Sequence, residues 1–337
     1  MVKIGVIGAG FMGAMHSQCY ALLPEAKLVG IADVRKEKAE ELAKKFNASA
    51  CQDAEELLKN PEIDAVDICL PTHIHRDWVV KASNAGKNIL CEKPIALSLQ
   101  DADEMVEAAR KNNVVFMVAQ VIRFWPEYIR LKEIKDSGEL GKLLSLALSR
   151  LSPLPTWGWE NWLQNPEKSG NALFDLHIHD TDYILYLLGK PKALFSSGTR
   201  VKGGYAHIFT LFEYPDCSVS AEGGWDFVDT FPFRMSFVAC FEKGAVEYDT
   251  GHNKPFAVYT AGKAEYPKLG EEIPRATDTS GNISELGGYY SEIEYFVECV
   301  GTKKKPSIVT PENARDSLAL VLKEKESAEK GEKISLK

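Results

Sequence analysis

The chain has 337 residues, of which 45% are hydrophobic and 26% charged, which predicts about two domains with sizeable buried cores. Its formal net charge of −8 argues against a nucleic-acid-binding surface, and no apolar run approaches the roughly 20 residues of a membrane helix. The seven cysteines are scattered without a C-x-x-C pair, and the chain starts in a strand pattern without the features of a signal peptide. We therefore expect a cytoplasmic protein with free thiols.

The first part of the chain alternates short apolar stretches with charged amphipathic ones. Strand–helix alternation predicts a parallel sheet with right-handed crossovers, and near-continuous apolar strands are typical of a sheet covered by helices on both faces. The predicted strands are Lys3–Ile7, Leu28–Ala32, Ala65–Leu70, Asn88–Cys91 and Val114–Ala119. We predict an α/β dinucleotide-binding domain of the Rossmann type over residues 1–122.

Beyond residue 122 the pattern changes to strands in which apolar and polar residues alternate. This pattern extends from about Leu143 to Tyr259 and includes a hairpin turn at 241–244. One helix is expected from about Ala172 to Leu188, and a terminal helix begins at Pro311 and runs to Gly331. Residues 123–337 therefore form a predicted α+β domain, whose terminal helix is long enough to pack back on the first domain.

A glycine-rich turn, GVIGAGFMG, joins the first predicted strand to the first helix. Its G-x-G-x-x-G pattern lets the backbone approach a pyrophosphate at the helix N-terminus. Asp33 ends the second strand about 20 residues later, where its carboxylate can hydrogen-bond an adenosine ribose. It would also repel the additional phosphate of NADP, so NAD is expected, although the nearby Arg35 leaves NADP possible. The alternative is that the glycines serve only tight packing. The predicted cofactor contacts here are Gly8, Gly10, Phe11, Met12, Gly13, Asp33 and Arg35.

Two histidines follow the fourth predicted strand, in the sequence LPTHIH. The H-x-H spacing of His73 and His75 could suggest a metal, but no third ligand is evident near them, and we expect no metal site. A loop at the edge of the nicotinamide crevice is favoured instead, with Thr72 or His75 starting the next helix. Pro71, Thr72 and His75 are accordingly predicted to contact the cofactor.

The fifth predicted strand ends in ILCEKP, residues 89–94. Pro94 has no N–H to donate and ends the strand just after Glu92 and Lys93. Charges at the end of a strand usually face solvent. The other interpretation is that this strand delivers a lysine to a ligand crevice.

With these motifs, the chain resembles the superfamily of glucose–fructose oxidoreductase, inositol dehydrogenase and rhizopine-catabolism oxidoreductases over nearly its whole length. The resemblance also rests on SGNALFDLHIHDTDYILYLLG and on the closing TPENARDSLALVLKEKESAEKGEKI. It implies a Rossmann domain followed by an open, mostly antiparallel sheet, a crevice that binds a sugar, cyclitol or related polyol, and a homodimer or homotetramer formed through that sheet. It further implies that Lys93 lies beside the nicotinamide and the substrate hydroxyl, with Glu92 orienting its neighbours and often a cis bond before Pro94. Asn171 stands where the family often has consecutive glycines, so the loop beside the substrate is expected to differ.

The segment FDLHIHDTD carries the candidate proton chemistry. On a helix, Asp175 and His179 are four residues apart and share a face that Asp182 joins, whereas His177 points elsewhere. An aspartate near an imidazole can fix its tautomer while the other ring nitrogen takes a hydroxyl proton. The resemblance indicates the same pair, Asp175 and His179, acting with Lys93, and implies substrate binding by Asp182. The alternative is a helix whose polar face only caps the crevice.

Two further features are candidate substrate contacts. Arg123 lies at the predicted domain junction, where the family often places substrate-facing groups. The tryptophans of PTWGWENW (Trp157, Trp159 and Trp162) could stack on a sugar, but core or interface packing is the more common role.

The leading hypothesis is an NAD-dependent dehydrogenase that reversibly oxidises a secondary hydroxyl of a cyclitol, sugar or sugar derivative. A second is a sugar- or dinucleotide-sensing regulator without turnover, which would be expected to lose the lysine and histidine positions that this chain retains. A third is a glycosidase in which the cofactor is transiently reduced, which would give no net NADH with any polyol.

Overall fold

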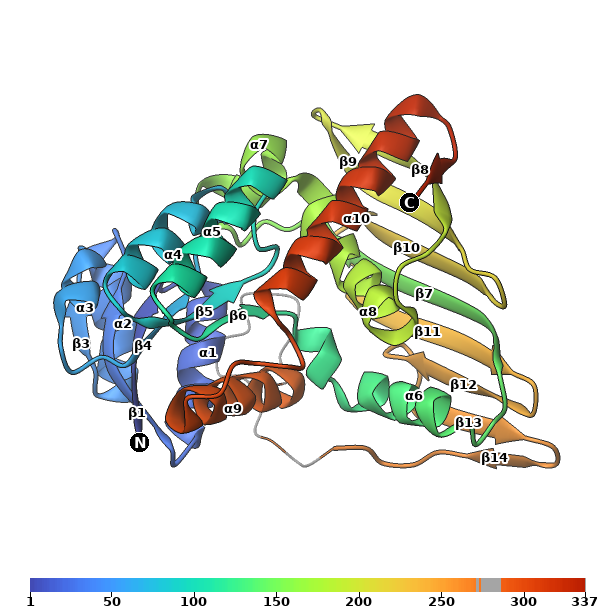
Figure 1. Cartoon of the computed structure of the whole chain (residues 1–337), viewed down its shortest axis with the longest axis horizontal. Coiled ribbons are helices and arrows are strands. Elements are labelled where there is room, and N and C mark those ends of the chain that lie inside the picture. The colour runs from blue at the N-terminus through green and yellow to red at the C-terminus, as the bar shows by residue number, and fades with distance from the viewer. Residues whose placement is uncertain (271–272, 274–285, 337) are drawn as a thin grey trace.

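The computed structural model describes residues 1–270, 273 and 286–336. Two sheets dominate the molecule, and they lie at opposite ends of its long axis with helices between and around them (Figure 1). In the described part of the chain, the helices are too short or too polar to cross a lipid bilayer.

The N-terminal sheet is parallel throughout, with strand order β3-β2-β1-β4-β5-β6. Its strands are β1 (Val2–Ile7), β2 (Ala26–Ala32), β3 (Ser49–Cys51), β4 (Ala65–Ile68), β5 (Asn88–Glu92) and β6 (Phe116–Ala119). The strand order reverses between β1 and β4, and ligands of such sheets bind at the carboxyl ends of the strands beside this switch point. The five predicted strands are present, and the short edge strand β3 is an addition that its partly exposed residues did not signal.

Helices cover both faces of this sheet: α1 (Phe11–Leu22), α2 (Lys36–Phe46), α3 (Glu55–Lys59), α4 (His75–Asn84) and α5 (Leu99–Lys111). Local sequence explains several of their ends. The side chain of Ser98 accepts a hydrogen bond from the Asp101 N–H and caps α5. Asn47 adopts the left-handed conformation just after α2 and lets the chain leave the helix.

The C-terminal sheet is mostly antiparallel, with strand order β14-β13-β12-β11-β7-β10-β9-β8-β15 and one parallel pair, β7 with β10. Its strands are β7 (Leu143–Pro153), β8 (Ala193–Val201), β9 (Gly204–Glu213), β10 (Ser218–Phe227), β11 (Arg234–Phe241), β12 (Gly244–Asp249), β13 (Phe256–Thr260), β14 (Lys263–Glu265) and β15 (Ile334–Ser335). The predicted hairpin joins β11 to β12, with Phe241 paired to Gly244. The two sheets together confirm the predicted fold class.

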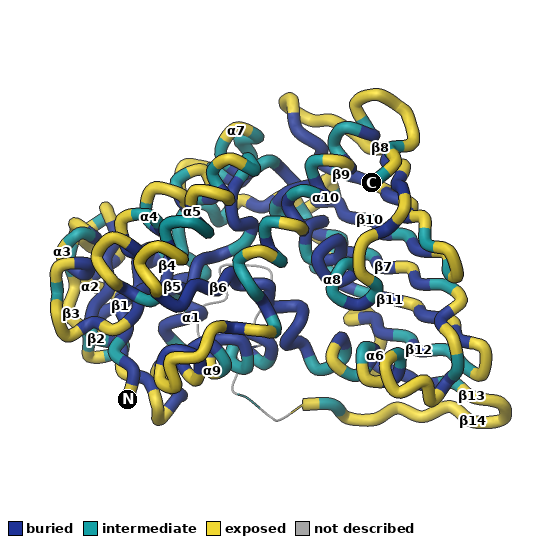
Figure 2. The backbone as a smooth tube through the Cα atoms, in the orientation of Figure 1, coloured by how far each residue is buried: buried dark blue, intermediate teal, exposed yellow. Residues whose placement is uncertain are grey.

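Among the described residues, the helices that pack on the C-terminal sheet lie on one of its faces (Figure 1). They are α6 (Pro126–Ser137), α8 (Ile178–Leu188) and α10 (Pro311–Lys330). α10 has a capping box at Thr310 and ends at Gly331, which has a left-handed conformation. The opposite face exposes large apolar side chains, including Phe209 and Leu211. Figure 2 shows exposure along β14 and on the outer turns of α4 and α5.

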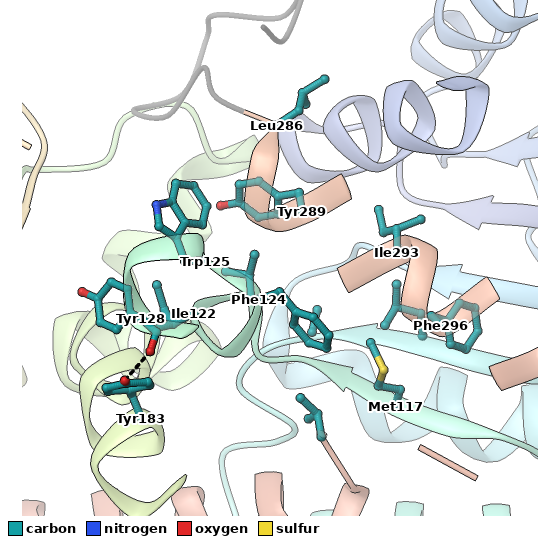
Figure 3. Close-up of a cluster of buried hydrophobic side chains, with 14 of the residues drawn as sticks. Met117, Ile122, Phe124, Trp125, Tyr128, Tyr183, Leu286, Tyr289, Ile293 and Phe296 are labelled. Atoms are coloured by element: carbon teal, nitrogen blue, oxygen red, sulfur yellow. Dashed lines mark hydrogen bonds between the residues drawn. The ribbon is translucent and has the colours of Figure 1, made fainter. Parts of the chain in front are cut away.

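The last two helices join the two parts of the molecule. α9 (Gly287–Thr302) packs against α1 and η2, the 3₁₀ turn at Val121–Phe124, and α10 packs against both α5 and β8. In Figure 3, Ile293 and Phe296 of α9 lie over Met117 of β6, beside Phe124. Residues far apart in the chain therefore complete the core of the N-terminal sheet.

Candidate active site

A cavity of about 410 Å³ lies between the two parts of the molecule. One wall is formed by residues at the carboxyl ends of β1, β2, β4, β5 and β6, and the other by residues from β7, β11, α9 and the 154–179 region. The cavity therefore occupies the place at which doubly wound sheets bind their ligands.

The glycine turn shapes the first wall. Gly8 has a φ of +106°, and a Cβ there would lie 2.3 Å from the Cys69 carbonyl oxygen. A Cβ on Gly13 would lie 1.8 Å from the Gly8 carbonyl oxygen, so α1 packs closely against the turn. A Cβ on Gly10 would meet nothing within 4 Å. Gly10 lines the cavity and precedes the first turn of α1, so this open space lies beside free helix N–H groups and fits a pyrophosphate.

Asp33 lies at the carboxyl end of β2 and is tied to this turn. Its Oδ2 accepts a hydrogen bond of 2.9 Å from the Ala9 N–H, and the Arg35 guanidinium donates to both carboxylate oxygens at 2.8 Å. Burial disfavours the charged carboxylate, but the hydrogen bonds from Arg35 and Ala9 outweigh burial and hold the pKa of Asp33 below its ordinary value. A negative charge is thus fixed where an adenosine ribose would lie.

Lys93 reaches across the cavity to the second wall. The Lys93–Pro94 peptide bond is cis, as the family resemblance implied. The Lys93 Nζ donates to the Asp175 carbonyl oxygen at 2.7 Å and to Asp175 Oδ1 at 2.9 Å, and both side chains remain partly exposed. The lysine therefore faces the cavity instead of bulk solvent, which is the second of the two interpretations of its strand end.

The segment that carries Asp175 and His179 is not a single regular helix. Leu173–His177 forms a π-helical turn, and α8 follows from Ile178. Asp175 and His179 both line the cavity, and His177 points away from it, as the spacing predicted. π-helical turns inside helices often occur at functional sites.

The electrostatic environment of His179 favours a neutral ring. Burial is the largest effect, and the nearby positive charges of Lys93 and Arg150 add to it, so the pKa of His179 lies well below its ordinary value. Its Nδ1 has no hydrogen-bond partner. A neutral imidazole at the cavity wall can accept a proton at pH 7.

Arg123 and Asp182, both expected at the substrate, lie outside the cavity lining in this structure. The Arg123 guanidinium donates to both oxygens of Asp182, at 2.8 and 2.7 Å, and both side chains are buried. Ser317 of α10 also donates to Asp182, at 2.7 Å. The cavity-facing side of the helix ends at His179, because one turn later the helix packs against η2 and α10. The Arg123–Asp182 pair instead links η2, α8 and α10.

The LPTHIH loop contributes residues both to the cavity lining and to the layer behind it. His75 is buried, with Nε2 2.8 Å from the Leu70 carbonyl oxygen and Nδ1 3.0 Å from the Pro94 carbonyl oxygen. Burial lowers the pKa of His75, so the ring is neutral and one nitrogen donates at a time. Thr72 is also buried, whereas Pro71 and His73 line the cavity. His75 therefore links this loop to the cis-proline loop.

His16 of α1 lies between two buried carboxylates, which the sequence did not predict. Its Nδ1 is 2.8 Å from Asp67 Oδ2, and its Nε2 is 3.3 Å from Glu92 Oε1. Burial opposes the positive charge, but the neighbouring Asp67 carboxylate outweighs burial and raises the pKa of His16 well above its ordinary value. Glu92 in turn accepts the Lys93 N–H at 3.0 Å. The imidazolium thus joins the glycine helix to the strand end that carries Lys93.

Part of this group has the geometry of a candidate metal site. Within the described residues, His16, Asp67 and Cys69 have ligand atoms close enough together to hold an ion. Their polar atoms already hydrogen-bond one another, with Cys69 Sγ 3.3 Å from Asp67 Oδ1. Burial raises the pKa of the Cys69 thiol, which keeps it protonated. The cluster is a hydrogen-bonded support for Glu92.

The second wall is rich in aromatic side chains. Trp157, Trp159 and Trp162 all line the cavity, together with Tyr289 of α9. Arg150 of β7 also reaches the lining while its guanidinium pairs with Asp180 at 2.9 Å. The sequence did not single out Arg150 or indicate that Tyr289 would contact a site built from residues near the N-terminus.

Fold and site geometry together define a two-domain protein whose interdomain cavity carries a dinucleotide-binding turn on one wall and a Lys–Asp–His group across it. Residues 2–120 match the family described as "Oxidoreductase family, NAD-binding Rossmann fold", and residues 128–247 match the GFO/IDH/MocA C-terminal domain. The chain is therefore built from the two domains of the GFO/IDH/MocA family, and its first domain is an NAD-binding Rossmann domain.

Individual relatives agree with this assignment. The chain is 28% identical to the scyllo-inositol 2-dehydrogenase (NAD(+)) of Bacillus subtilis over 99% of this chain and 96% of that protein. It is 32% identical to the myo-inositol 2-dehydrogenase of Thermotoga maritima over 59% of this chain and 58% of that protein. The chain spans about half the length of several other curated relatives that it matches. A solved levoglucosan dehydrogenase in complex with NADH and L-sorbose has the same fold, with a TM-score of 0.83, 23% identity and coverage of 100% of this chain and 99% of that one.

Proposed function

We propose that the protein is an NAD-dependent dehydrogenase that oxidises a secondary hydroxyl of a cyclitol, sugar or sugar derivative to a ketone. The observation that carries the proposal is the convergence of Lys93, Asp175 and His179 on one cavity that also holds the glycine turn and Asp33. Two of the relatives are inositol dehydrogenases and another is a levoglucosan dehydrogenase, which supports the substrate class.

The proposed residue roles follow from charge and position. The Lys93 ammonium would hydrogen-bond the reacting oxygen and stabilise the negative charge that develops on it. Neutral His179 would take the hydroxyl proton, and Asp175 would hold Lys93 in place through the two contacts described above. Bound NAD would accept the hydride, so the alcohol loses two electrons and two hydrogens and the products are a ketone, NADH and a proton. The reverse reaction uses the same groups.

The cofactor contacts are proposed from the same geometry. The open space at Gly10 would receive the pyrophosphate, with Phe11, Met12 and Gly13 forming the first turn of the helix behind it. Asp33 would bind the adenosine ribose. Pro71 and Glu92 line the cavity farther along, and Thr72 and His75 would support them from behind.

A direct assay tests this function. The purified protein should reduce NAD in the presence of at least one compound in a panel of inositols, aldoses, anhydro-sugars and sugar acids, with NADP tested in parallel. Absence of net NADH with every compound, despite measurable NADH binding, would contradict a dehydrogenase and favour a reaction in which the cofactor is only transiently reduced. Absence of NADH binding would contradict any NAD-dependent function.

The exposed face of the C-terminal sheet supports a homo-oligomer, a dimer or tetramer. Phe195 of β8 is paired with Leu211 of β9, and a row of small or apolar residues continues across the sheet through Ala147 to Val238. Phe195, Leu211 and Val238 are exposed on the sheet face opposite α6, α8 and α10 (Figure 1), and contiguous apolar patches mark interaction sites. Light scattering should give a multiple of the chain mass, and Leu211→Lys should reduce it. An unmodified protein that is monomeric at micromolar concentration would contradict the proposal.

Two coarser assignments accompany the function. Residues 1–122 would form the cofactor domain and residues 123–337 the substrate and oligomerisation domain, with α9 and α10 returning to the first. A cytoplasmic location is proposed because all seven cysteines are free, as expected in a reducing compartment. Fractionation of the producing cells would test the location.

A further inference from the structure

A short segment of the second domain reaches the part of the cavity where Asp33 lies. The 3₁₀ segment η3 (Trp159–Gln164) begins with Trp159, whose ring centroid lies 5.3 Å from the Arg35 guanidinium carbon. Arg35 itself is held by its two hydrogen bonds to Asp33. Trp159, Arg35 and Asp33 all line the same cavity. The indole is thus placed beside the predicted ribose site, although it belongs to the other domain.

The indole has an open surface that the protein does not cover. Trp159 is 45% exposed, whereas Trp125 and Trp225 are almost fully buried. Val34, which follows Asp33, is 62% exposed and lines the same cavity. Leaving large apolar surface in water is unfavourable. A flat apolar ligand that covered both side chains would remove this surface from water.

The backbone beside Trp159 is held in an uncommon conformation. Glu160 and Asn161 have φ values of +51° and +52°, a region that non-glycine residues rarely adopt and that persists only where the surroundings enforce it. Gly158 precedes them, and a Cβ there would lie 3.1 Å from the Trp162 ring. The turn therefore presents Trp159 toward Arg35 at some conformational cost.

We propose that Trp159 and Arg35, which contact one another, together form a wall of the adenine pocket beside Val34. The inference rests on the proposed NAD-dependent function. With the ribose at Asp33, the attached purine extends past the end of β2 toward residues 34–35 and Trp159. Purines present a flat π-face that stacks on indole and guanidinium groups irrespective of base edge. The second domain would then contribute to cofactor binding at the end of the cavity away from the reacting groups.

The test compares two halves of the cofactor. Dissociation constants for NADH, ADP-ribose and reduced nicotinamide mononucleotide are measured by calorimetry for the unmodified protein, Trp159→Ala and Trp159→Phe. Stacking of one base changes binding by roughly tenfold to a hundredfold in alanine substitutions. Trp159→Ala should weaken NADH and ADP-ribose by about that factor and leave the mononucleotide unchanged. Trp159→Phe, which keeps an aromatic face, should be intermediate.

The matched control is Tyr266→Ala. Tyr266 is also an exposed aromatic residue over a cation, with Lys254 Nζ 4.4 Å from its ring centroid, and it does not line the cavity. This variant should bind all three ligands as the unmodified protein does. Equal binding of ADP-ribose by Trp159→Ala, or equal weakening of both halves, would overturn the inference and leave the proposed function standing. If the unmodified protein binds neither NADH nor ADP-ribose, the proposed function fails and the inference fails with it.

Discussion

The Lys93 ammonium bridges the two domains by donating to both the backbone carbonyl and the carboxylate of Asp175, at 2.7 and 2.9 Å. The two residues are 82 positions apart in the chain. This double contact fixes the lysine at the cavity wall while leaving it partly exposed to a ligand.

Lys93→Met removes the charge and keeps most of the side-chain length. We expect normal folding, because the side chain lies at a cavity and not in a core, and a loss of about a hundredfold or more in kcat, because the developing oxyanion loses its stabilising donor. Steady-state kinetics measures the loss, and Lys81→Met, which removes an exposed lysine paired with Glu55, is the matched control. Near-normal turnover in Lys93→Met would return this lysine to a surface role.

His179 should titrate below the range usual for histidine. Because a proton acceptor works in its neutral form, and because the pKa of His179 is lowered by burial and by Lys93 and Arg150, activity should persist below pH 6.5 before it falls. The fall in kcat/KM at acidic pH, the acidic limb of the pH profile, measures this titration. His179→Ala should lose about 10²–10⁴ in rate and lose the limb with it. An acidic limb above pH 6.5 that survives in His179→Ala would assign the base to another group.

Asp33 should set the preference for NAD. Asp33→Ala removes the ribose acceptor, and hydrogen bonds to a charged group are worth about 1.5–3 kcal/mol, so the KM for NAD should rise roughly tenfold to a hundredfold. The same change releases Arg35 from its ion pair, so efficiency with NADP should improve relative to NAD. The double variant Asp33→Ala/Arg35→Ala should lose that relative gain. Equal efficiency of the unmodified protein with both cofactors would contradict the role of Asp33.

His177 contributes to stability instead of proton transfer. Its Nε2 lies 2.6 Å from Glu324 Oε2, and neither side chain is exposed. His177→Ala removes one of the hydrogen-bond partners of the buried Glu324 carboxyl and leaves those from Thr181 and Thr210, which should cost about 1–3 kcal/mol of the free energy of unfolding. Denaturant unfolding measures the cost, and His252→Ala, an exposed histidine, should change stability by less than about 0.5 kcal/mol. A much smaller loss in His177→Ala would mean that water or a neighbour replaces the imidazole.

Because of His16, the free energy of unfolding should fall as pH rises. A histidine buried in its neutral form would have the opposite effect. Its pKa is raised in the folded protein, so the folded state holds a proton that the unfolded chain has lost above about pH 6.5. The stabilisation is complete below that pH and is lost as pH rises through the folded pKa. The groups around it are Asp67, Glu92, Glu292, Cys69, Cys19 and Tyr289. His16→Gln should flatten the decline in unfolding free energy above pH 6.5, and an unchanged slope would show that another group causes it.

Sequence patterns predicted the parts of the structure that depend on neighbours in the chain. The glycine turn, the acid at the end of β2 and the capped α10 follow from local backbone requirements. The pairing of Arg123 with Asp182 joins residues 59 positions apart, and helical periodicity carries no information about such a partner. Helical spacing placed Asp182 on the face of Asp175 and His179, and the family resemblance implied that it binds substrate. Neither indicated that η2 and α10 cover the next turn of the helix.

The π-helical turn shows that sequence patterns can also miss a feature within a single element. Asp175 and His179 reach the cavity as their spacing predicted, but the backbone between them is wider than an α-helix, and no residue in FDLHIHDTD signals that change. The contribution of Tyr289 could not be predicted for a different reason. α9 contacts α1, which is near the other end of the chain, and local sequence patterns carry no information about such a contact.

The return of α9 and α10 to the first domain has a consequence for synthesis on the ribosome. β1 to β6 leave the ribosome first, but the helix that supplies Ile293 and Phe296 to their core comes after the entire C-terminal sheet. At roughly 5–20 residues per second, the apolar surface beneath α9 stays uncovered for on the order of ten seconds. The nascent N-terminal sheet is therefore expected to depend on chaperones until release, and chains cut before residue 287 should aggregate instead of yielding an independently folded cofactor domain.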